Sequence, residues 1–90
     1  MKHPSEIGRA PILAKTIGSR RHVALIALLK RERVAAGITQ TEVAKVLGEH
    51  QSFIARLETG QRRVDVVEFR NIAQVLGFDP KIMIKRLEAK

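Results

Sequence analysis

The stretch ITQTEVAKVLGEHQSFIARLETG, residues 38–60, decides the fold because it contains the signals for two short helices joined at a sharp turn. Thr39 is followed three residues later by Glu42, the pattern of a capping box, which starts a helix by satisfying its first backbone N–H groups. Gly48 can adopt the left-handed conformation that ends a helix. The helical pattern resumes at Gln51, after only two intervening residues. We therefore expect two helices in close succession.

Start and stop signals of the same kind predict three further helices, one before this stretch and two after it. Ser19 is a suitable N-cap before an apolar segment that Gly37 ends, Asp65 begins a second capping box, and Asp79 stands before a proline at the first helical position. No segment alternates with period two. The predicted fold class is all-α, a compact domain of five helices. Apolar residues expected at its core positions are Leu25, Leu28, Leu29, Ala36, Val43, Ala44, Leu47, Ile54, Leu57, Phe69, Ile72, Ala73 and Leu76.

Composition limits the class of protein. Ninety residues suit a single small domain, and the absence of cysteine excludes disulfides and thiolate metal sites and is compatible with a reducing compartment. The longest apolar run, Val23–Leu29, is too short to span a bilayer and is flanked by charges. We interpret it as part of a core helix, and we expect a cytoplasmic protein with no cofactor and no metal.

The chain carries a large positive charge. Seventeen Lys and Arg against nine Asp and Glu give +8, and residues 1–37 hold eight of the basic and only two of the acidic groups. Such a charge indicates an anionic partner, most commonly nucleic acid, with an acidic membrane surface or an acidic protein as alternatives. Residues 1–18 are interrupted by proline and glycine without periodicity, which predicts a mobile basic arm before a domain in residues 19–90.

One face of the helix expected at 51–58 is polar throughout. Successive residues turn by about 100°, so that positions 51, 52, 55, 56 and 59 form one stripe, opposite Ile54 and Leu57. The side chains on that stripe suit contacts with DNA bases: glutamine matches adenine, arginine matches guanine, the serine hydroxyl is adaptable, and a methyl group suits thymine. The alternative is an ordinary solvated face on a surface helix.

The segment RVAAGITQTEVAKVLGEHQSFIARLETGQRRVDVVEFRNIAQVLG, residues 33–77, resembles the lambda-repressor-like (XRE, Cro/repressor type) helix-turn-helix family of DNA-binding proteins. The resemblance extends over roughly residues 25–88. It implies the five-helix fold of that family, with the third predicted helix in the major groove of duplex DNA. The residues that carry it are Arg33, Gly37, Thr39, Gln40, Ala44, Gly48, Gln51, Ser52, Ile54, Glu58, Gly60, Arg62 and Arg63.

The resemblance also implies individual roles on the second and third helices. Gln51, Ser52 and Arg56 would contact base edges in the major groove. Ala55 lies on the same face and would touch a thymine methyl group. Gln40, at the start of the preceding helix, would contact a phosphate and brace Gln51. These five residues are the expected centre of the DNA contact.

Further roles implied by the resemblance concern charged residues. Arg62 and Arg63, just beyond the third helix, would bind backbone phosphates. Arg33 and Glu58 would form an internal ion pair with an architectural role; the alternative is two surface charges that never meet. His50 departs from the family pattern, in which Ser or Thr caps the third helix, because imidazole is a poorer cap.

Two groups of apolar residues keep two interpretations open. Phe53 lies between the polar and apolar stripes, and it is either a core-edge residue or a contact to sugar or a base methyl group. Met83, Ile84 and Leu87 on the last helix are either the final part of the core or a dimer contact. One short helix cannot both bury these three residues completely in the core and present them completely to a second copy of the chain.

The leading hypothesis is a transcriptional regulator that binds double-stranded DNA as a homodimer on a palindromic site. The second is an antitoxin or adaptor module whose main role is to bind a protein partner, such as a toxin or another regulator. An enzyme is not expected, because His3, His22 and His50 accompany no cysteine nucleophile, metal-ligand cluster or phosphate loop. Membrane association through Arg20–Leu29 is disfavoured because the core needs that apolar stripe.

Overall fold

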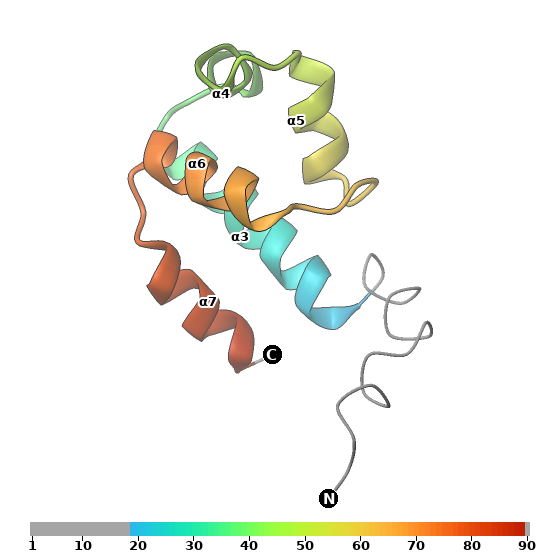
Figure 1. Ribbon diagram of the computed structural model, residues 1–90, viewed down its shortest axis with the longest axis vertical. Coiled ribbons are helices and arrows are strands. Elements are labelled where there is room, and N and C mark those ends of the chain that lie inside the picture. Colours follow the sequence, from blue (N-terminus) through green and yellow to red (C-terminus); the bar gives the residue numbers. More distant parts are fainter. Residues whose placement is uncertain (1–18, 90) are drawn as a thin grey trace, which may run out of the picture.

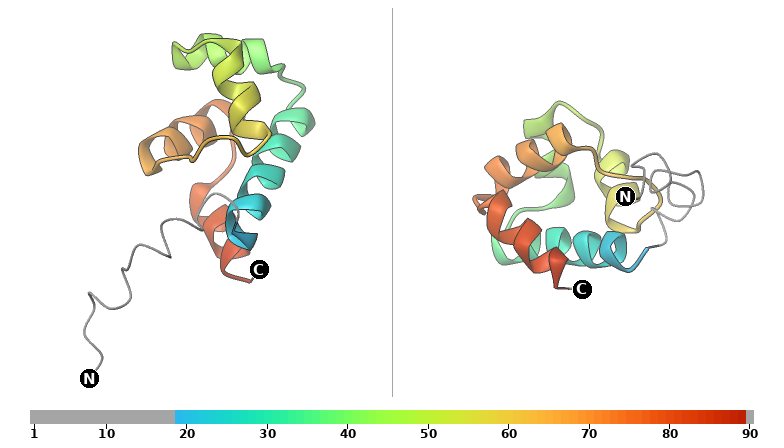
Figure 2. Two further views of the ribbon diagram at one scale, coloured as in Figure 1. Left: turned by 90° about the vertical axis from the view of Figure 1, so that its right-hand side faces the viewer. Right: turned by 60° about the horizontal axis from the view of Figure 1, so that its bottom comes forward.

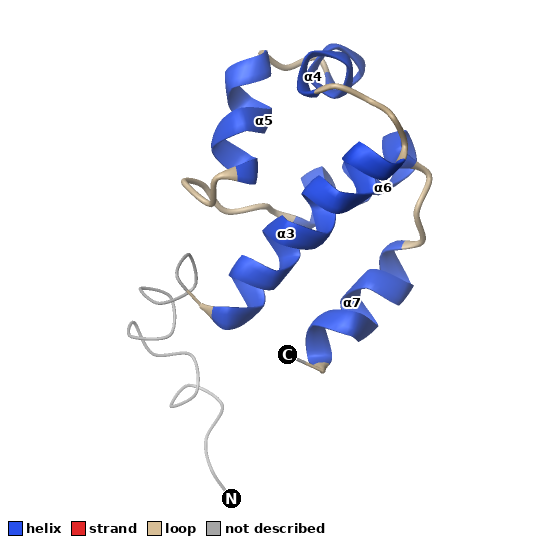
Figure 3. Ribbon diagram, turned by 180° about the vertical axis from the view of Figure 1, so that it is seen from behind, coloured by secondary structure: helices blue, strands red, loops and turns tan. Residues whose placement is uncertain are grey.

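The computed structural model describes residues 19–89, so that the arm expected in residues 1–18 lies outside the described range. Within that range all regular elements are helices, and no strand occurs (Figure 3). This confirms the predicted all-α fold. The helices are α3 (Arg20–Ala35), α4 (Gln40–Leu47), α5 (Gln51–Glu58), α6 (Val66–Leu76) and α7 (Pro80–Glu88).

The helix ends follow the predicted capping signals. At the start of α4, the Thr39 hydroxyl accepts from the Glu42 N–H at 3.1 Å, and the Glu42 carboxylate accepts from the Thr39 N–H at 2.8 Å. The second capping box, at Asp65 and Glu68, is also complete. Gly48 ends α4 in the left-handed conformation with φ of 74°. Local hydrogen bonds therefore fix where these helices begin and end.

The helices are arranged around two adjoining clusters of buried side chains. α4 and α5 lie together at one end of the molecule and α7 lies at the other, with α3 in contact with both α5 and α7 (Figures 1 and 2). α6 packs against α4 and α7. The larger cluster consists of Ile26, Leu29, Leu57, Phe69, Ile72 and Met83, and the smaller of Val43, Ala44 and Ile54.

The buried face of α3 differs from the prediction. His22, Ile26 and Leu29 are its buried residues, whereas Leu25 and Leu28 are only half-buried. Ala36 was expected in the core but is exposed, because the helix ends at the residue before it. Since α3 is almost continuously apolar in its middle, helical periodicity alone does not select one face. A hydrophobic pattern does not predict that a histidine such as His22 is buried.

Two other predicted core positions lie at the edge of the core. Leu47 and Leu76 are half-buried, and both pack against the two clusters at once. They join the part of the core that surrounds α4 to the part that surrounds α3 and α7. Separately, no helix in residues 19–89 is long and apolar enough to cross a membrane.

Candidate nucleic-acid interface

Helix α5 depends on tertiary contacts for its stability. It is eight residues long, shorter than helices that persist in isolation. Ile54 is buried against α4 in the smaller cluster, and Leu57 is buried in the larger one. Because these two residues lie on one face, packing fixes the rotation of the helix about its own axis. The opposite face is therefore directed away from the protein.

The polar stripe on that opposite face is accessible. Gln51, Ser52 and Arg56 are exposed, and Ala55 between them is half-buried. Thr59, which closes the stripe, is exposed and donates its hydroxyl to the Arg56 carbonyl at 3.2 Å. Arg56 forms no ion pair with any residue in the described part of the chain. The guanidinium is thus available to an external acceptor.

The start of α5 has no side-chain cap. His50 occupies the N-cap position with extended backbone and makes no capping hydrogen bond, as expected for imidazole. The first turn carries no acidic residue either. The turn before it is held by backbone groups, since the Glu49 N–H donates to the Ala44 carbonyl at 2.8 Å across Gly48. The position of α5 therefore depends on the glycine turn and on packing, not on capping.

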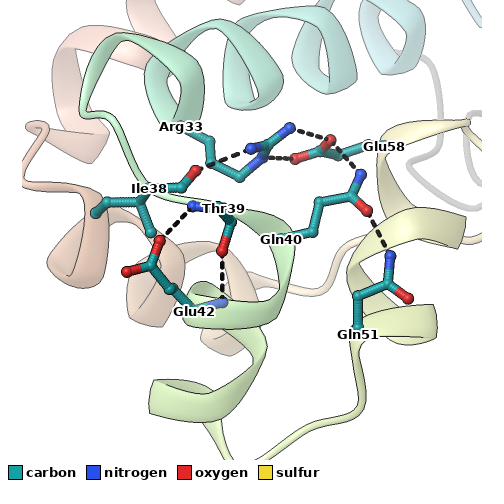
Figure 4. A network of polar contacts seen from close by, with 7 residues as sticks. All are labelled: Arg33, Ile38, Thr39, Gln40, Glu42, Gln51 and Glu58. Carbon is teal, nitrogen blue, oxygen red and sulfur yellow. Dashed lines mark hydrogen bonds and ion pairs between the residues drawn. The ribbon is translucent and has the colours of Figure 1, made fainter.

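An ion pair joins α3 to the end of α5 (Figure 4). Arg33 Nε donates to Glu58 Oε2 at 2.6 Å, and Arg33 Nη2 donates to Glu58 Oε1 at 3.0 Å. The third guanidinium nitrogen, Nη1, donates to the Ile38 carbonyl at 2.8 Å. The Glu58 side chain is only 4% exposed and that of Arg33 is 13% exposed. The hydrogen bond to Glu58 raises the pKa of Arg33 further above its ordinary value, so the guanidinium stays charged despite its burial.

Two glutamines extend this network to the surface. Gln40 Nε2 donates to Glu58 Oε1 at 2.9 Å, and Gln51 Nε2 donates to Gln40 Oε1 at 2.6 Å. Gln40 is half-buried and Gln51 is exposed (Figure 4). The chain of hydrogen bonds thus runs from the buried carboxylate of Glu58 to the first residue of α5. It brings together four of the residues singled out in the sequence, from three different helices.

Arg62 and Arg63 lie in different surroundings. The Arg62 guanidinium is within 3.1 to 3.2 Å of the Glu68 carboxylate oxygens, and its central carbon lies 4.2 Å from the centroid of the Phe53 ring. Arg63 is exposed and has no ion pair in residues 19–89. Phe53 is half-buried and touches both core clusters, which places it at the core edge. Its ring is covered by arginine in this structure.

The association of Phe53, Arg62 and Glu68 was missed by sequence reasoning. Glu68 is the second residue of the capping box that Asp65 begins, and in that role it accepts from the Asp65 N–H at 3.1 Å. Its carboxylate also neutralises Arg62. A basic and an acidic residue six apart across a short loop can pair when the loop folds back, and this spacing is the one feature of the sequence that indicates the contact. The cluster fixes the segment that follows α5.

Two short helices joined at a left-handed glycine, with an exposed polar face on the second, define a helix-turn-helix DNA-binding domain. A family model described as helix-turn-helix matches residues 29–82, more than half of the chain. The chain belongs to the XRE-type helix-turn-helix family of DNA-binding transcription regulators.

Relatives support the same assignment. An uncharacterized HTH-type transcriptional regulator of Bacillus subtilis (strain 168), YqaF, is 37% identical over 51 residues, which span 57% of this chain and 67% of YqaF. Among solved structures, an XRE-family like protein from Pseudomonas syringae pv. tomato str. DC3000 is similar with a TM-score of 0.76 and 45% sequence identity. That similarity covers 87% of this chain and 95% of the Pseudomonas chain.

Proposed function

We propose that this protein is a sequence-specific regulator of transcription that inserts α5 into the major groove of double-stranded DNA. One observation carries the proposal: Gln51, Ser52 and Arg56 are exposed on a helix whose other face is buried, so that a duplex can reach them. The major groove admits an α-helix and presents a distinct pattern of donors and acceptors for each base pair. The net charge of +8 favours association with phosphate.

Each side chain on the exposed face has its own proposed contact. Arg56 offers two parallel donors to guanine, and Gln51 offers a donor and an acceptor to adenine. Ser52 would donate to a base or a nearby phosphate. Ala55, half-buried beneath them, leaves room for a thymine methyl group.

The proposed phosphate contacts surround the base contacts. Gln40 reaches toward α5 at one end of the face, and Arg63 is exposed beyond the other. Arg62 is also proposed to bind a phosphate, but its guanidinium is already paired with Glu68. A phosphate would have to share the guanidinium with that carboxylate or displace it. Arg63 is therefore the simpler candidate for a phosphate contact.

We further propose that two copies bind a palindromic site. A single α5 contacts only a few bases, and two copies on half-sites about 34 Å apart supply more specificity. Ile84 and Leu87 support a contact between copies, because they line an open apolar groove of about 150 Å³ together with Val66 and Phe69. Met83, by contrast, is buried in the core.

Selection from a pool of random duplexes tests this function. The full chain should enrich a two-fold symmetric motif, and a variant carrying both Gln51→Ala and Arg56→Ala should enrich none while remaining helical by circular dichroism. Failure of the unaltered chain to enrich any motif would reject sequence-specific binding. Retention of a stoichiometric protein partner in high salt would then favour the antitoxin or adaptor alternative, since phosphate contacts weaken steeply under those conditions.

A further inference from the structure

The Arg62 side chain is held between α5 and α6, although the residue itself belongs to the loop that joins them. Its guanidinium carbon lies 4.2 Å from the centroid of the Phe53 ring on α5. Its Nη1 and Nη2 donate to the Glu68 carboxylate on α6 at 3.1 to 3.2 Å. The Arg62 side chain is 33% exposed and that of Glu68 is 25% exposed. This ion pair therefore lies near the surface, where an external anion can reach it.

The position of the Glu68 carboxylate does not depend on Arg62. Its Oε1 accepts from the Asp65 N–H at 3.1 Å, and the Glu68 N–H donates to the Asp65 carboxylate at 2.7 Å. These two hydrogen bonds form the capping box at the start of α6 and fix the carboxylate at the first turn of the helix. Because the capping box is local, the carboxylate stays beside the guanidinium when an anion approaches Arg62.

A DNA phosphate and the Glu68 carboxylate compete for the same hydrogen-bond donors. Both are anions that accept from the terminal nitrogens of an arginine. Glu68 already engages both terminal nitrogens of Arg62. A phosphate that leaves Glu68 in place is repelled by its negative charge, and a phosphate that displaces Glu68 must break the ion pair. On either route the contact between Arg62 and the phosphate is weakened.

Arg63, the next residue, has no such competitor. It is exposed and forms no ion pair in the described part of the chain. Its charge is available in full to a phosphate, whereas ionised Arg62 and Glu68 together carry no net charge. Two neighbouring arginines in one loop thus offer phosphate contacts of different strength, and the difference comes from a residue on α6.

We propose that Glu68 competes with DNA for Arg62 and thereby lowers the affinity of the protein for every duplex, whatever its sequence. This inference rests on the proposed function, to which it adds a residue that sets the strength of binding without touching a base. Every duplex presents phosphates, so the competition is independent of the base contacts of α5. Base preference and overall affinity are then controlled from different helices.

Glu68→Gln tests this inference in the full chain. Glutamine keeps an acceptor for the capping box and for Arg62 but has no negative charge. We expect the variant to bind the selected duplex and a scrambled one about tenfold more tightly at about 0.1 M salt, and the slope of log affinity against log salt to steepen by about one. Both are the effects of one additional phosphate contact. Glu68→Ala, which also lacks the carboxylate, is the second variant, and circular dichroism identifies the folded ones.

Glu49→Gln is the matched control. Glu49 and Glu68 line the same cleft of about 100 Å³, but the Glu49 side chain forms no hydrogen bond or ion pair in residues 19–89. The substitution therefore changes the net charge of the protein by the same amount without releasing Arg62. We expect it to change either affinity by less than about twofold, because salt screens an exposed charge that contacts no phosphate.

The same substitution in a chain that lacks Arg62 separates competition from a general charge effect. Compared with Arg62→Ala, the double variant Arg62→Ala/Glu68→Gln should gain no more affinity than Glu49→Gln does. An equal gain with and without Arg62 overturns the inference, and so does a folded variant without the carboxylate that binds no more tightly than the unaltered chain. A gain confined to the selected duplex overturns it as well. If Arg63→Ala weakens all binding while Glu68→Gln has no effect, the inference fails and the proposed function stands; no duplex binding by the unaltered chain or by Glu68→Gln rejects both.

Discussion

Gln40 and Glu58 share a hydrogen bond of 2.9 Å that joins the first residue of α4 to the last residue of α5. Beneath it, Val43 and Ile54 bring the same two helices together in an apolar cluster. The two helices are thus tied by a polar contact and by an apolar one. Arg33 connects the polar contact to α3, so the recognition surface is held by three helices.

Removal of Arg33 should strongly destabilise the fold. Arg33→Ala leaves the buried Glu58 carboxylate without its charged partner, and we expect a loss of about 3 kcal/mol or more in the free energy of unfolding. Arg31→Ala, an exposed position on the same helix with no ion pair in the described residues, should change it by less than about 0.5 kcal/mol. Urea denaturation measures the free energy of unfolding of both variants. Similar midpoints for Arg33→Ala and Arg31→Ala would refute a structural role for the ion pair between Arg33 and Glu58.

The turn between α4 and α5 should depend on glycine at position 48. Gly48 has φ of 74°, and a Cβ added there would have open space around it, so backbone strain is the only cost of substitution. We expect Gly48→Ala to lower the free energy of unfolding by about 1 kcal/mol. Gly48→Asn should cost less, since asparagine tolerates the left-handed region. Thermal unfolding measures which of the two variants is less stable. An equal loss of unfolding free energy in Gly48→Ala and Gly48→Asn would contradict the prediction.

Stability at acid pH should include a contribution from Glu42. The backbone N–H of Thr39 donates to the Glu42 carboxylate and lowers its pKa below the ordinary value of 4.5. A pKa that is lower in the folded than in the unfolded chain means that ionised Glu42 stabilises the fold above the unfolded value. That contribution disappears as the pH falls through the folded pKa. Glu42→Gln keeps an acceptor for the capping box but cannot titrate.

The measurement for Glu42 is the free energy of unfolding between neutral pH and pH 3. We expect the curve of Glu42→Gln to fall less steeply in the acid range than that of the unaltered chain. Glu49→Gln is a suitable control, since Glu49 is exposed and its side chain forms no hydrogen bond or ion pair in residues 19–89. Curves of Glu42→Gln and the unaltered chain that stay parallel down to pH 3 would contradict the assignment.

Arg56 and Arg63 should affect DNA binding in different ways. Arg56→Ala is expected to relax the preference for one base by about tenfold, because it removes a bidentate base contact. Arg63→Ala should weaken binding to every duplex and reduce the slope of log affinity against log salt by about one, as expected for one lost phosphate contact. Titrations of the selected duplex and a scrambled one at several salt concentrations separate the two. Identical profiles for both variants would refute the division of roles.

The groove between α3, α6 and α7 should mediate contact between two copies. Val66 is 81% exposed and Ile84 is 48% exposed, so Val66→Glu and Ile84→Glu introduce a charge there without disturbing the core. We expect each to weaken self-association at least about tenfold by sedimentation equilibrium, because an apolar contact excludes an unpaired charge. Val46→Glu, an exposed site on α4 outside the groove, is the matched control. Self-association that neither Val66→Glu nor Ile84→Glu weakens would place the interface elsewhere.

The helices could be predicted from sequence because their signals are local. The capping boxes that begin α4 and α6 each involve residues three apart, and Gly48 needs only its own lack of a side chain. The buried face of α3 could not be predicted in the same way. Its middle is apolar on all sides, so tertiary contacts select Ile26 for the core cluster, and His22 is buried as well.

Some features of the candidate site could likewise be predicted from the sequence, and others could not. The polar stripe of α5 followed from helical geometry and is exposed as expected, with Ala55 half-buried. The pairing of Arg33 with Glu58 was suggested only by resemblance, since periodicity carries no information about residues 25 apart. The position of Arg62 over Phe53 brings together residues from α5 and from the loop that follows it, and helical periodicity does not predict such a contact.

By itself the sequence determined where the helices of residues 19–89 begin and end, the polar face of α5 and the excess of positive charge, since each depends on residues within one or two turns or on simple counts. Tertiary structure alone decided which face of α3 is buried, which partner neutralises Arg62 and in which direction the amides of Gln40 and Gln51 point. Those outcomes depend on groups brought together from different helices. A hydrogen bond acts over about 3 Å in space, whatever the separation of its partners along the chain.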